Sequence, residues 1–353
     1  MPHDRPAATS PYSRLPFAAA GSGRPLFGIF LAYLLTVSGA VRAQDAAADP
    51  QERREHPSAP SPGAVATVNP SCEKADAEAC TGLGFQHLEG DGITKDEARA
   101  AWLFAQGCEF GSMRGCTMAG YVHAEGQGVG VAPDVAASFY ARACDGGETT
   151  ACSNLGLAYV VGLGVPKDPA RANALFGQAC DQGAVAGCAN LGASYSLGRG
   201  VKRDQRRAAG LFQRACEAGD THACYNLGVL HRDGLGMRKD FKQAIMLFER
   251  ACAADDASAC GNLGFMVDDG RGTDRDRDRA LALFDKACGL GHPESCFTLG
   301  RAYQTGNGRP RDDARAVALL ERTLALDPAT PSAAEASKAL RLAREPVAAE
   351  PKP

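Results

Sequence analysis

The feature that most constrains this chain is the spacing of its cysteines. The chain has 353 residues and 14 cysteines, and the step from one cysteine to the next alternates between 8 and 28 positions without a slip. Seven cysteine pairs therefore recur with a period of 36 residues. A fixed period of this length is typical of proteins that stack copies of one supersecondary unit. The cysteines lie at positions 72, 80, 108, 116, 144, 152, 180, 188, 216, 224, 252, 260, 288 and 296.

Other residues keep the same period when positions are counted from the second cysteine of each pair. Every repeat has glycine at +4, +10 and +12 and alanine at +20, and six of the seven have aspartate at +16. Apolar, aromatic or histidine residues at −1, +3 and +7 predict one face of a first helix, which the glycines at +10 and +12 end. Aspartate at +16 is a good N-cap, and the residues at +20, +23, +24 and +27 follow the stripe of a second helix. The sequence therefore predicts an all-α solenoid of helix-turn-helix repeats.

The segments outside the repeats differ in composition. Residues 1–43 are predicted to be a signal peptide, because Arg14 and Arg24 precede a short apolar run that ends before a small-x-Ala site at Ala43. An uncleaved anchor is the alternative. Residues 44–70 and 346–353 are rich in Ala, Pro and charge and are predicted to be a disordered linker and tail. The solenoid is predicted to span 71–345, with a capping helix from Ser332 to Glu345.

The net charge of the chain and its predicted export limit the functions that it can have. The formal net charge is −3 and no block of five or six like charges occurs, which argues against a protein that binds nucleic acid. Regularly spaced cysteines in an exported chain indicate disulfides rather than a metal site. A zinc site would favour close C-x-x-C pairs, which the sequence lacks.

The segment CSNLGLAYVVGLGVPKDPARANALFGQAC, from Cys152 to Cys180, resembles the Sel-1-like repeat, a relative of the tetratricopeptide repeat. With its paired cysteines the chain is similar to the cysteine-rich Hcp family of secreted solenoids, over about residues 72–325. The resemblance implies a right-handed α/α solenoid with a disulfide across each turn between repeats. The implied bonds are Cys72–Cys80, Cys108–Cys116, Cys144–Cys152, Cys180–Cys188, Cys216–Cys224, Cys252–Cys260 and Cys288–Cys296.

A ligand-binding groove is predicted on the first helices, which line the concave face in related solenoids. Position +2 is asparagine in four consecutive repeats, too deep in the helix to be an N-cap, and its amide could hold the backbone of an extended peptide. These asparagines could instead bond a neighbouring repeat or water. Flanking residues at +5 and +9 suggest a ligand with some basic character. The predicted groove residues are Asn154, Asn190, Asn226, Asn262, Tyr121, Val229, Phe265, Asp233 and Asp269.

The resemblance also raises an enzymatic alternative, because the cysteine-rich family includes members reported to bind or hydrolyse β-lactams. Ser71-Cys72-Glu73-Lys74 matches S-x-x-K, but the S-D-N and K-T-G partner motifs are missing. His87, His123 and His231 share position +7, where packing is a better explanation than metal binding. No catalytic residue, metal or cofactor is predicted.

The sequence thus predicts an exported scaffold, periplasmic or secreted and monomeric, that binds peptides or proteins. Membrane contact is expected only through an uncleaved leader. A β-lactamase is the alternative, and a mitochondrial intermembrane-space assembly factor is a second one.

Overall fold

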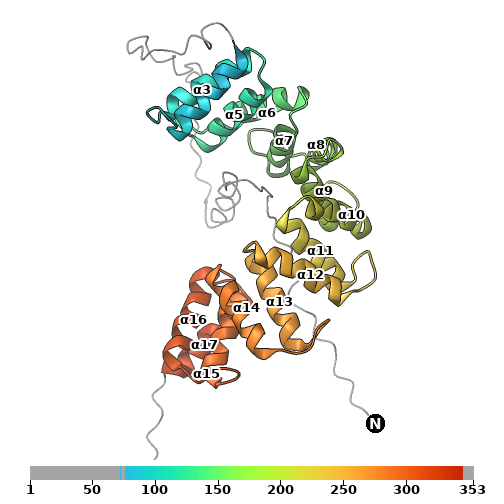
Figure 1. The fold of residues 1–353 in the computed structure, drawn as a ribbon, viewed down its shortest axis with the longest axis vertical. Coiled ribbons are helices and arrows are strands. Elements are labelled where there is room, and N and C mark those ends of the chain that lie inside the picture. The colour runs from blue at the N-terminus through green and yellow to red at the C-terminus, as the bar shows by residue number, and fades with distance from the viewer. Residues whose placement is uncertain (1–71, 73–75, 345–353) are drawn as a thin grey trace, which may run out of the picture. The chain divides into compact units, whose positions relative to one another are not determined.

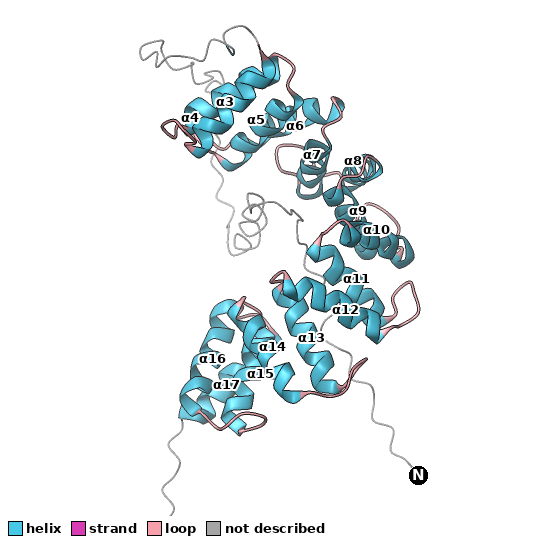
Figure 2. Cartoon of the chain, viewed as in Figure 1, coloured by secondary structure: helices cyan, strands magenta, loops and turns pink. Residues whose placement is uncertain are grey.

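The structure is a computed structural model that describes Cys72 and residues 76–344. Over these residues the regular structure consists of fifteen helices and no strand (Figure 2). The predicted signal peptide, linker and C-terminal tail lie outside the described residues. The first helices of the seven repeats are α3 (Ala77–Glu89), α5 (Met113–Glu125), α7 (Thr149–Val161), α9 (Val185–Leu197), α11 (Thr221–Asp233), α13 (Ala257–Asp269) and α15 (Pro293–Thr305). The second helices are α4 (Glu97–Glu109), α6 (Pro133–Asp145), α8 (Pro169–Asp181), α10 (Gln205–Glu217), α12 (Phe241–Ala253), α14 (Arg277–Gly289) and α16 (Asp313–Leu326), and α17 (Pro331–Arg344) follows them.

The helices form two compact units. The first holds α3 to α8, the part of α9 up to Asn190, and residues 199–201, and the second holds the rest of α9 with α10 to α17. Within each unit a helix packs mainly against the helices before and after it in the sequence (Figure 1). This is the contact pattern of a solenoid, in which each repeat contacts only its neighbours. The predicted all-helical repeat fold is confirmed.

Side-chain caps fix where the helices begin. The aspartates at +16 accept hydrogen bonds from backbone N–H groups of the second helices, as Asp204 does from Arg207 at 3.0 Å. In the second repeat Ala132 occupies this position and α6 begins without a side-chain cap. A second capping position, which was not predicted from the sequence, lies four residues before the second cysteine of a pair. Side chains that cap first helices there are Asp76, Ser112, Asp220, Asp256 and His292.

After the first repeat, the second glycine of the G-x-G turn has a role beyond ending the first helix. A Cβ at Gly236 would touch the backbone of Gln205 and Arg206, at the start of the preceding second helix. A Cβ at Gly128 would likewise touch the backbone of Glu97 and Ala98. The turn of one repeat therefore lies directly on the second helix of the repeat before it.

The core of six of the seven repeats rests on a glycine and an aromatic ring. A Cβ at Gly228 would lie 2.7 Å from the ring of Phe248, and Gly264 has the same relation to Phe284. Both rings are fully buried. Glycine at +4 therefore lets the second helix place its ring against the first helix. The other rings or side chains at +24 are Phe104, Tyr140, Phe176, Phe212 and Leu320.

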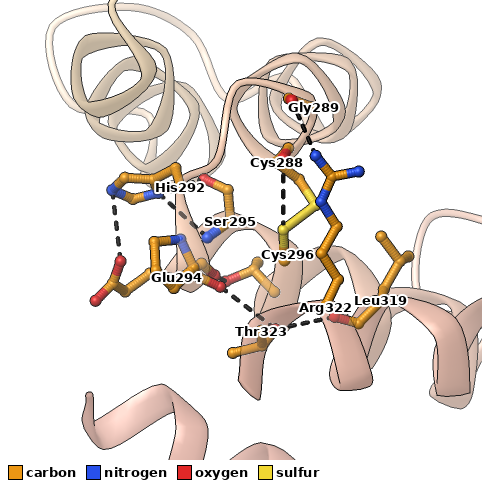
Figure 3. The surroundings of a disulfide bond; sticks show 11 residues. Cys288, Gly289, His292, Glu294, Ser295, Cys296, Leu319, Arg322 and Thr323 are labelled. Carbon is orange, nitrogen blue, oxygen red and sulfur yellow. Dashed lines mark hydrogen bonds and ion pairs between the residues drawn. A yellow bond between two sulfur atoms is a disulfide. The ribbon is translucent and has the colours of Figure 1, made fainter. Parts of the chain in front are cut away.

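All fourteen cysteines are paired in seven disulfides, with the partners that the resemblance implied. Six bonds join the end of a second helix to the next first helix, as Cys288 in α14 joins Cys296 in α15 (Figure 3). Beside that bond Arg322 of α16 donates to the Gly289 carbonyl at 2.9 Å, where a cation at a helix C-terminus is favourable. Seven such bonds indicate an oxidising environment, such as the periplasm or the outside of the cell.

Helix α17 covers the last repeat. Its Ala336, Ala339 and Leu340 form a buried cluster with Leu320 of α16. Position +28 of this repeat is Leu324 instead of cysteine, and its side chain packs against the same cluster. The apolar face of the last helix pair is thereby removed from water.

None of the helices in the described part of the chain is long and apolar enough to span a membrane.

Candidate functional site

The asparagines at position +2 lie in the second turn of the first helices, as the sequence predicted, but they are less exposed than a ladder of ligand contacts would require. Asn190 is 4% exposed, Asn226 is 8% and Asn262 is 6%. Asn154 is half-buried. Asn226 in α11 and Asn262 in α13 belong to the second unit.

Asn262 is the centre of a hydrogen-bond network. Its Nδ2 donates to the Ser258 carbonyl at 2.8 Å, and its Oδ1 accepts from Nη1 of Arg232 in the preceding repeat. The Tyr225 hydroxyl also hydrogen-bonds with Asn262, and burial raises the pKa of Tyr225 to about 12. The tyrosine therefore stays neutral over the physiological range. Asn262 links two repeats, which is the structural alternative raised by the sequence.

Arg232 changes the electrostatics of the predicted acidic flank. Its guanidinium binds Asp233 through two bonds, Nε to Oδ1 at 2.8 Å and Nη2 to Oδ2 at 2.7 Å. The Arg232 side chain is only 11% exposed, whereas the Asp233 side chain is 40% exposed, so the arginine is shielded from water and its partner is not. Asp269 is paired with Arg271 at 3.0 Å. Neither predicted acidic residue is a free carboxylate, and the expected preference for a basic ligand loses its support.

Asn226 differs from Asn262 in having an unused acceptor. Its Oδ1 is buried and has no hydrogen-bond partner among the described residues. An unpaired buried polar atom costs about 1–3 kcal/mol. Val229, one turn further along α11, is 4% exposed. Phe265 in α13 is half-buried and packs its ring 4.7 Å from that of Phe284.

In the first unit, the predicted residues surround a tyrosine that stands where most repeats have phenylalanine. Tyr140 hydrogen-bonds with Asn154, and burial raises the pKa of its hydroxyl. Tyr121 is 7% exposed, and burial raises its pKa, with a further contribution from Glu125. Burial also raises the pKa of Glu125.

A histidine–aspartate pair joins two helix starts in the second unit. His222 Nδ1 lies 2.9 Å from Oδ2 of Asp256, which itself caps α13 by accepting from the Ala259 N–H at 2.7 Å. This hydrogen bond to Asp256 raises the pKa of His222, and Asp220 adds to the shift. In the next repeat the pKa of a histidine shifts in the opposite direction, because burial lowers the pKa of His292.

The His222–Asp256 pair should make stability depend on pH. The raised pKa means that the folded chain favours charged His222. The pair therefore adds to the free energy of unfolding in full at pH values below 6.5, the ordinary pKa of histidine, and this contribution is lost as the pH rises through the pKa of His222 in the folded chain. We expect His222→Gln to cost about 0.5–1 kcal/mol at pH 5.5 and almost nothing at pH 8. Urea unfolding of both chains at the two pH values measures this. Asp256→Asn retains an N-cap residue and should remove the same pH-dependent gain; a cost of His222→Gln that is equal at both pH values would contradict the assignment.

The remaining sequence predictions concern metals and hydrolysis. His87, His123 and His231 each bury an Nδ1 atom without a partner among the described residues, and all three are half-buried. Among the residues the structure describes, no group of three or more His, Cys, Asp or Glu is placed to hold a metal ion. Ser71 and Lys74 of the S-x-x-K match lie outside the described residues, and the cysteine between them is bonded to Cys80.

Sequence reasoning missed Arg232, Tyr225 and the His222–Asp256 pair. A signal for the arginine was present: position +8 is Leu88, Ala124, Val160 or Ser196 in the first four repeats, and a charged residue first occurs there at Arg232. Tyr225 likewise stands at +1, where Thr81, Thr117 and Ser153 occur in the first three repeats. His222 gave no such signal, because its partner lies 34 residues away.

Comparison with known proteins bears on the fold and the family. A sequence model of the Sel1 repeat matches seven segments, residues 77–111, 114–148, 149–183, 185–220, 221–256, 257–292 and 293–327. Comparison with curated proteins gave no match.

Several solved structures resemble the chain. A protective antigen of uropathogenic Escherichia coli with an SLR fold aligns with a TM-score of 0.66 and 24% identity, over 76% of this chain and 57% of that one. This chain thus spans little more than half the length of the antigen. A Sel1 repeat protein from Oxalobacter formigenes aligns with a TM-score of 0.65 and 25% identity, over 77% of each chain. Cysteine rich protein B of Helicobacter pylori is 33% identical over 36% of this chain and 90% of its own, with a TM-score of 0.30.

Proposed function

Since the chain belongs to the Sel1 repeat family, we propose that it is an exported scaffold that binds a peptide or protein segment on the first helices around Asn226. Solenoids of stacked helix pairs commonly present extended surfaces for protein partners. The proposed face consists of positions +2, +5 and +9 of α11 and α13. Its residues are Asn226, Val229, Asp233, Asn262, Phe265 and Asp269.

The observation that carries the proposal is the unpaired Oδ1 of Asn226. Its neighbour Asn262 has partners for both ends of the amide. The Asn226 side chain keeps 8% of its surface exposed, and rotation about χ2 would turn its oxygen toward a ligand. A backbone N–H of an extended peptide would supply the missing donor.

The other residues of the face have supporting roles in this proposal. Asn262 and Asp233 hold Arg232 between the two repeats, so they would fix the shape of the face rather than contact the ligand. Because the carboxylates are already paired, the ligand would be recognised through its backbone and apolar side chains, without a requirement for positive charge.

A peptide library selected on the full-length oxidised chain tests the proposal. For the selected peptides we expect Asn226→Ala to raise Kd about tenfold, the loss of one hydrogen bond to a buried acceptor. Asn307→Ala, which changes an exposed asparagine in the last G-x-G turn, should leave Kd unchanged. Equal affinity of wild type and Asn226→Ala would contradict the assignment, and selection of no peptide would count against a peptide ligand altogether.

A further inference from the structure

One surface of the chain differs sharply from its equivalents in other repeats. The six residues at positions +14 to +19 include the turn after G-x-G and the start of the second helix. In Lys202–Arg207 they comprise four basic and one acidic residue, a net charge of +3, and in Arg238–Gln243 three basic and one acidic, a net charge of +2. The equivalent segments Asp274–Arg279 and Pro310–Arg315 have equal numbers of basic and acidic residues. Two adjacent repeats therefore concentrate positive charge in a chain whose net charge is −3.

The basic side chains of these two repeats are mostly unpaired. We call them the basic edge: Lys202, Arg203, Arg206, Arg207, Arg238, Lys239 and Lys242, all of which are exposed. Within the described residues, six of the seven side chains have no ion pair or hydrogen bond; the exception is Arg207, which contacts Asp204 and Tyr195. Lys239 lies over the ring of Phe241.

In the two following repeats the corresponding arginines are mostly neutralised. Arg277 pairs with Asp268 at 2.5 Å and Arg279 with Glu249 at 2.6 Å. In the last repeat Arg311 pairs with Asp313 at 2.9 Å and Arg315 with Asp312 at 3.4 Å. The contrast shows that a repeat of this kind needs no excess of positive charge at these positions in order to fold.

The two halves of the basic edge are contiguous. Gly236, in the turn that leads to Arg238, lies against the backbone of Arg206 at the start of α10. Figure 2 draws this turn as the loop between α11 and α12. Met246 lies one helical turn beyond Lys242 on α12 and is 60% exposed. The edge thus has an exposed apolar side chain one turn beyond its last lysine.

We propose that the basic edge docks the protein on a membrane surface that contains anionic phospholipids. Clusters of four to eight Lys and Arg residues are attracted to such surfaces without a shaped site. Long, exposed and unpaired side chains on turns and helix starts suit a broad layer of phosphates, and Met246 could enter the interface. The edge is formed by turns and second helices, so this inference does not rest on the proposed peptide-binding face.

Vesicle co-sedimentation of the full-length oxidised chain tests the inference. The probes are vesicles of phosphatidylcholine with phosphatidylglycerol and vesicles of phosphatidylcholine alone, and the readout is the ratio of the two partition coefficients. Arg203→Glu with Lys239→Glu changes position +15 in both basic repeats. Arg275→Glu with Arg311→Glu changes the same position in the two balanced repeats. Both double variants alter the net charge equally and both retain residues 1–43.

The first double variant should lower the ratio by a factor of at least about 25, since each lost basic residue near an anionic surface contributes about fivefold and each new glutamate is repelled. The second should lower it less than threefold, and 0.5 M salt should abolish the preference of the wild type. An unchanged ratio in the first variant, or an equal fall in both, would overturn the proposal. Binding of soluble polyglutamate without binding of the vesicles would also overturn it, in favour of an acidic polypeptide.

Discussion

Gly128→Ala is expected to lower the free energy of unfolding by about 3 kcal/mol. Gly128 has a φ of 70°, and an L-residue with a side chain loses about 1–2 kcal/mol in this left-handed region. The new methyl group would also meet the backbone of Glu97 and Ala98. Backbone cannot rotate away as a flexible side chain can, so overpacking should add roughly 1–3 kcal/mol.

The chain contains a matched control in its first repeat. Gly92 has a φ of 71° and occupies the same position in its turn, but a Cβ there would have no described atom within 4 Å. Gly92→Ala should therefore cost only the conformational part, about 1 kcal/mol. Guanidinium chloride unfolding followed by circular dichroism, with the disulfides intact, compares the two variants. Equal midpoints for Gly92→Ala and Gly128→Ala would show that the approach between repeats contributes nothing to stability.

Removing one disulfide should have an effect of similar size. The Cys252–Cys260 bond closes a short loop of sequence separation 8, for which the loss of chain entropy in the unfolded state corresponds to roughly 2–3 kcal/mol. Both cysteines are buried, so the double change Cys252→Ala with Cys260→Ala also loses packing of the two sulfur atoms. We expect a fall of about 3–4 kcal/mol in the free energy of unfolding.

Ser258→Ala provides the comparison, because Ser258 lies in the same loop and its side chain can be removed without breaking the covalent link. Its backbone carbonyl would still accept from Asn262. Mass measurement after alkylation should confirm that the other six disulfides remain formed in the double variant. If the double variant unfolds at the same denaturant concentration as Ser258→Ala, the Cys252–Cys260 bond does not contribute to the free energy of unfolding, and the prediction is wrong.

The repeat architecture could be predicted because each local signal occurs in six or all seven of the repeats. Each signal has a local cause. Aspartate at +16 caps a helix, glycine at +4 permits a close approach of two helices, glycine at +10 forms a turn, and the paired cysteines lie on either side of the turn between repeats. That the second glycine also supports the contact between repeats could not be inferred, since Gly236 meets Arg206 thirty residues earlier in the sequence. Periodicity shows which positions face inward, but it does not show which repeat supplies the opposing atoms.

The candidate face was harder to predict, because its chemistry depends on departures from the repeat. Asn226 and Asn262 share a position and a residue type, yet of the two only Asn262 is hydrogen-bonded to Arg232 and Tyr225. Their difference comes from the side chains that the preceding repeat offers, which for Asn262 include a charged residue at +8. An argument from the consensus treats the four asparagines as equivalent and therefore misses the one whose acceptor is unused.

The contact between Gly236 and the preceding helix bears on how a chain like this can change in evolution. The same positions meet at each junction between neighbours, so the gain or loss of one complete unit recreates a junction of the existing kind. An insertion or deletion of another length within a repeat would break the 36-residue register, and one between the two cysteines of a pair would change the spacing of 8 residues that their bond closes. Duplication in whole units is therefore the change in length that this architecture tolerates best, while substitutions on the exposed surface remain free to give each copy its own charge.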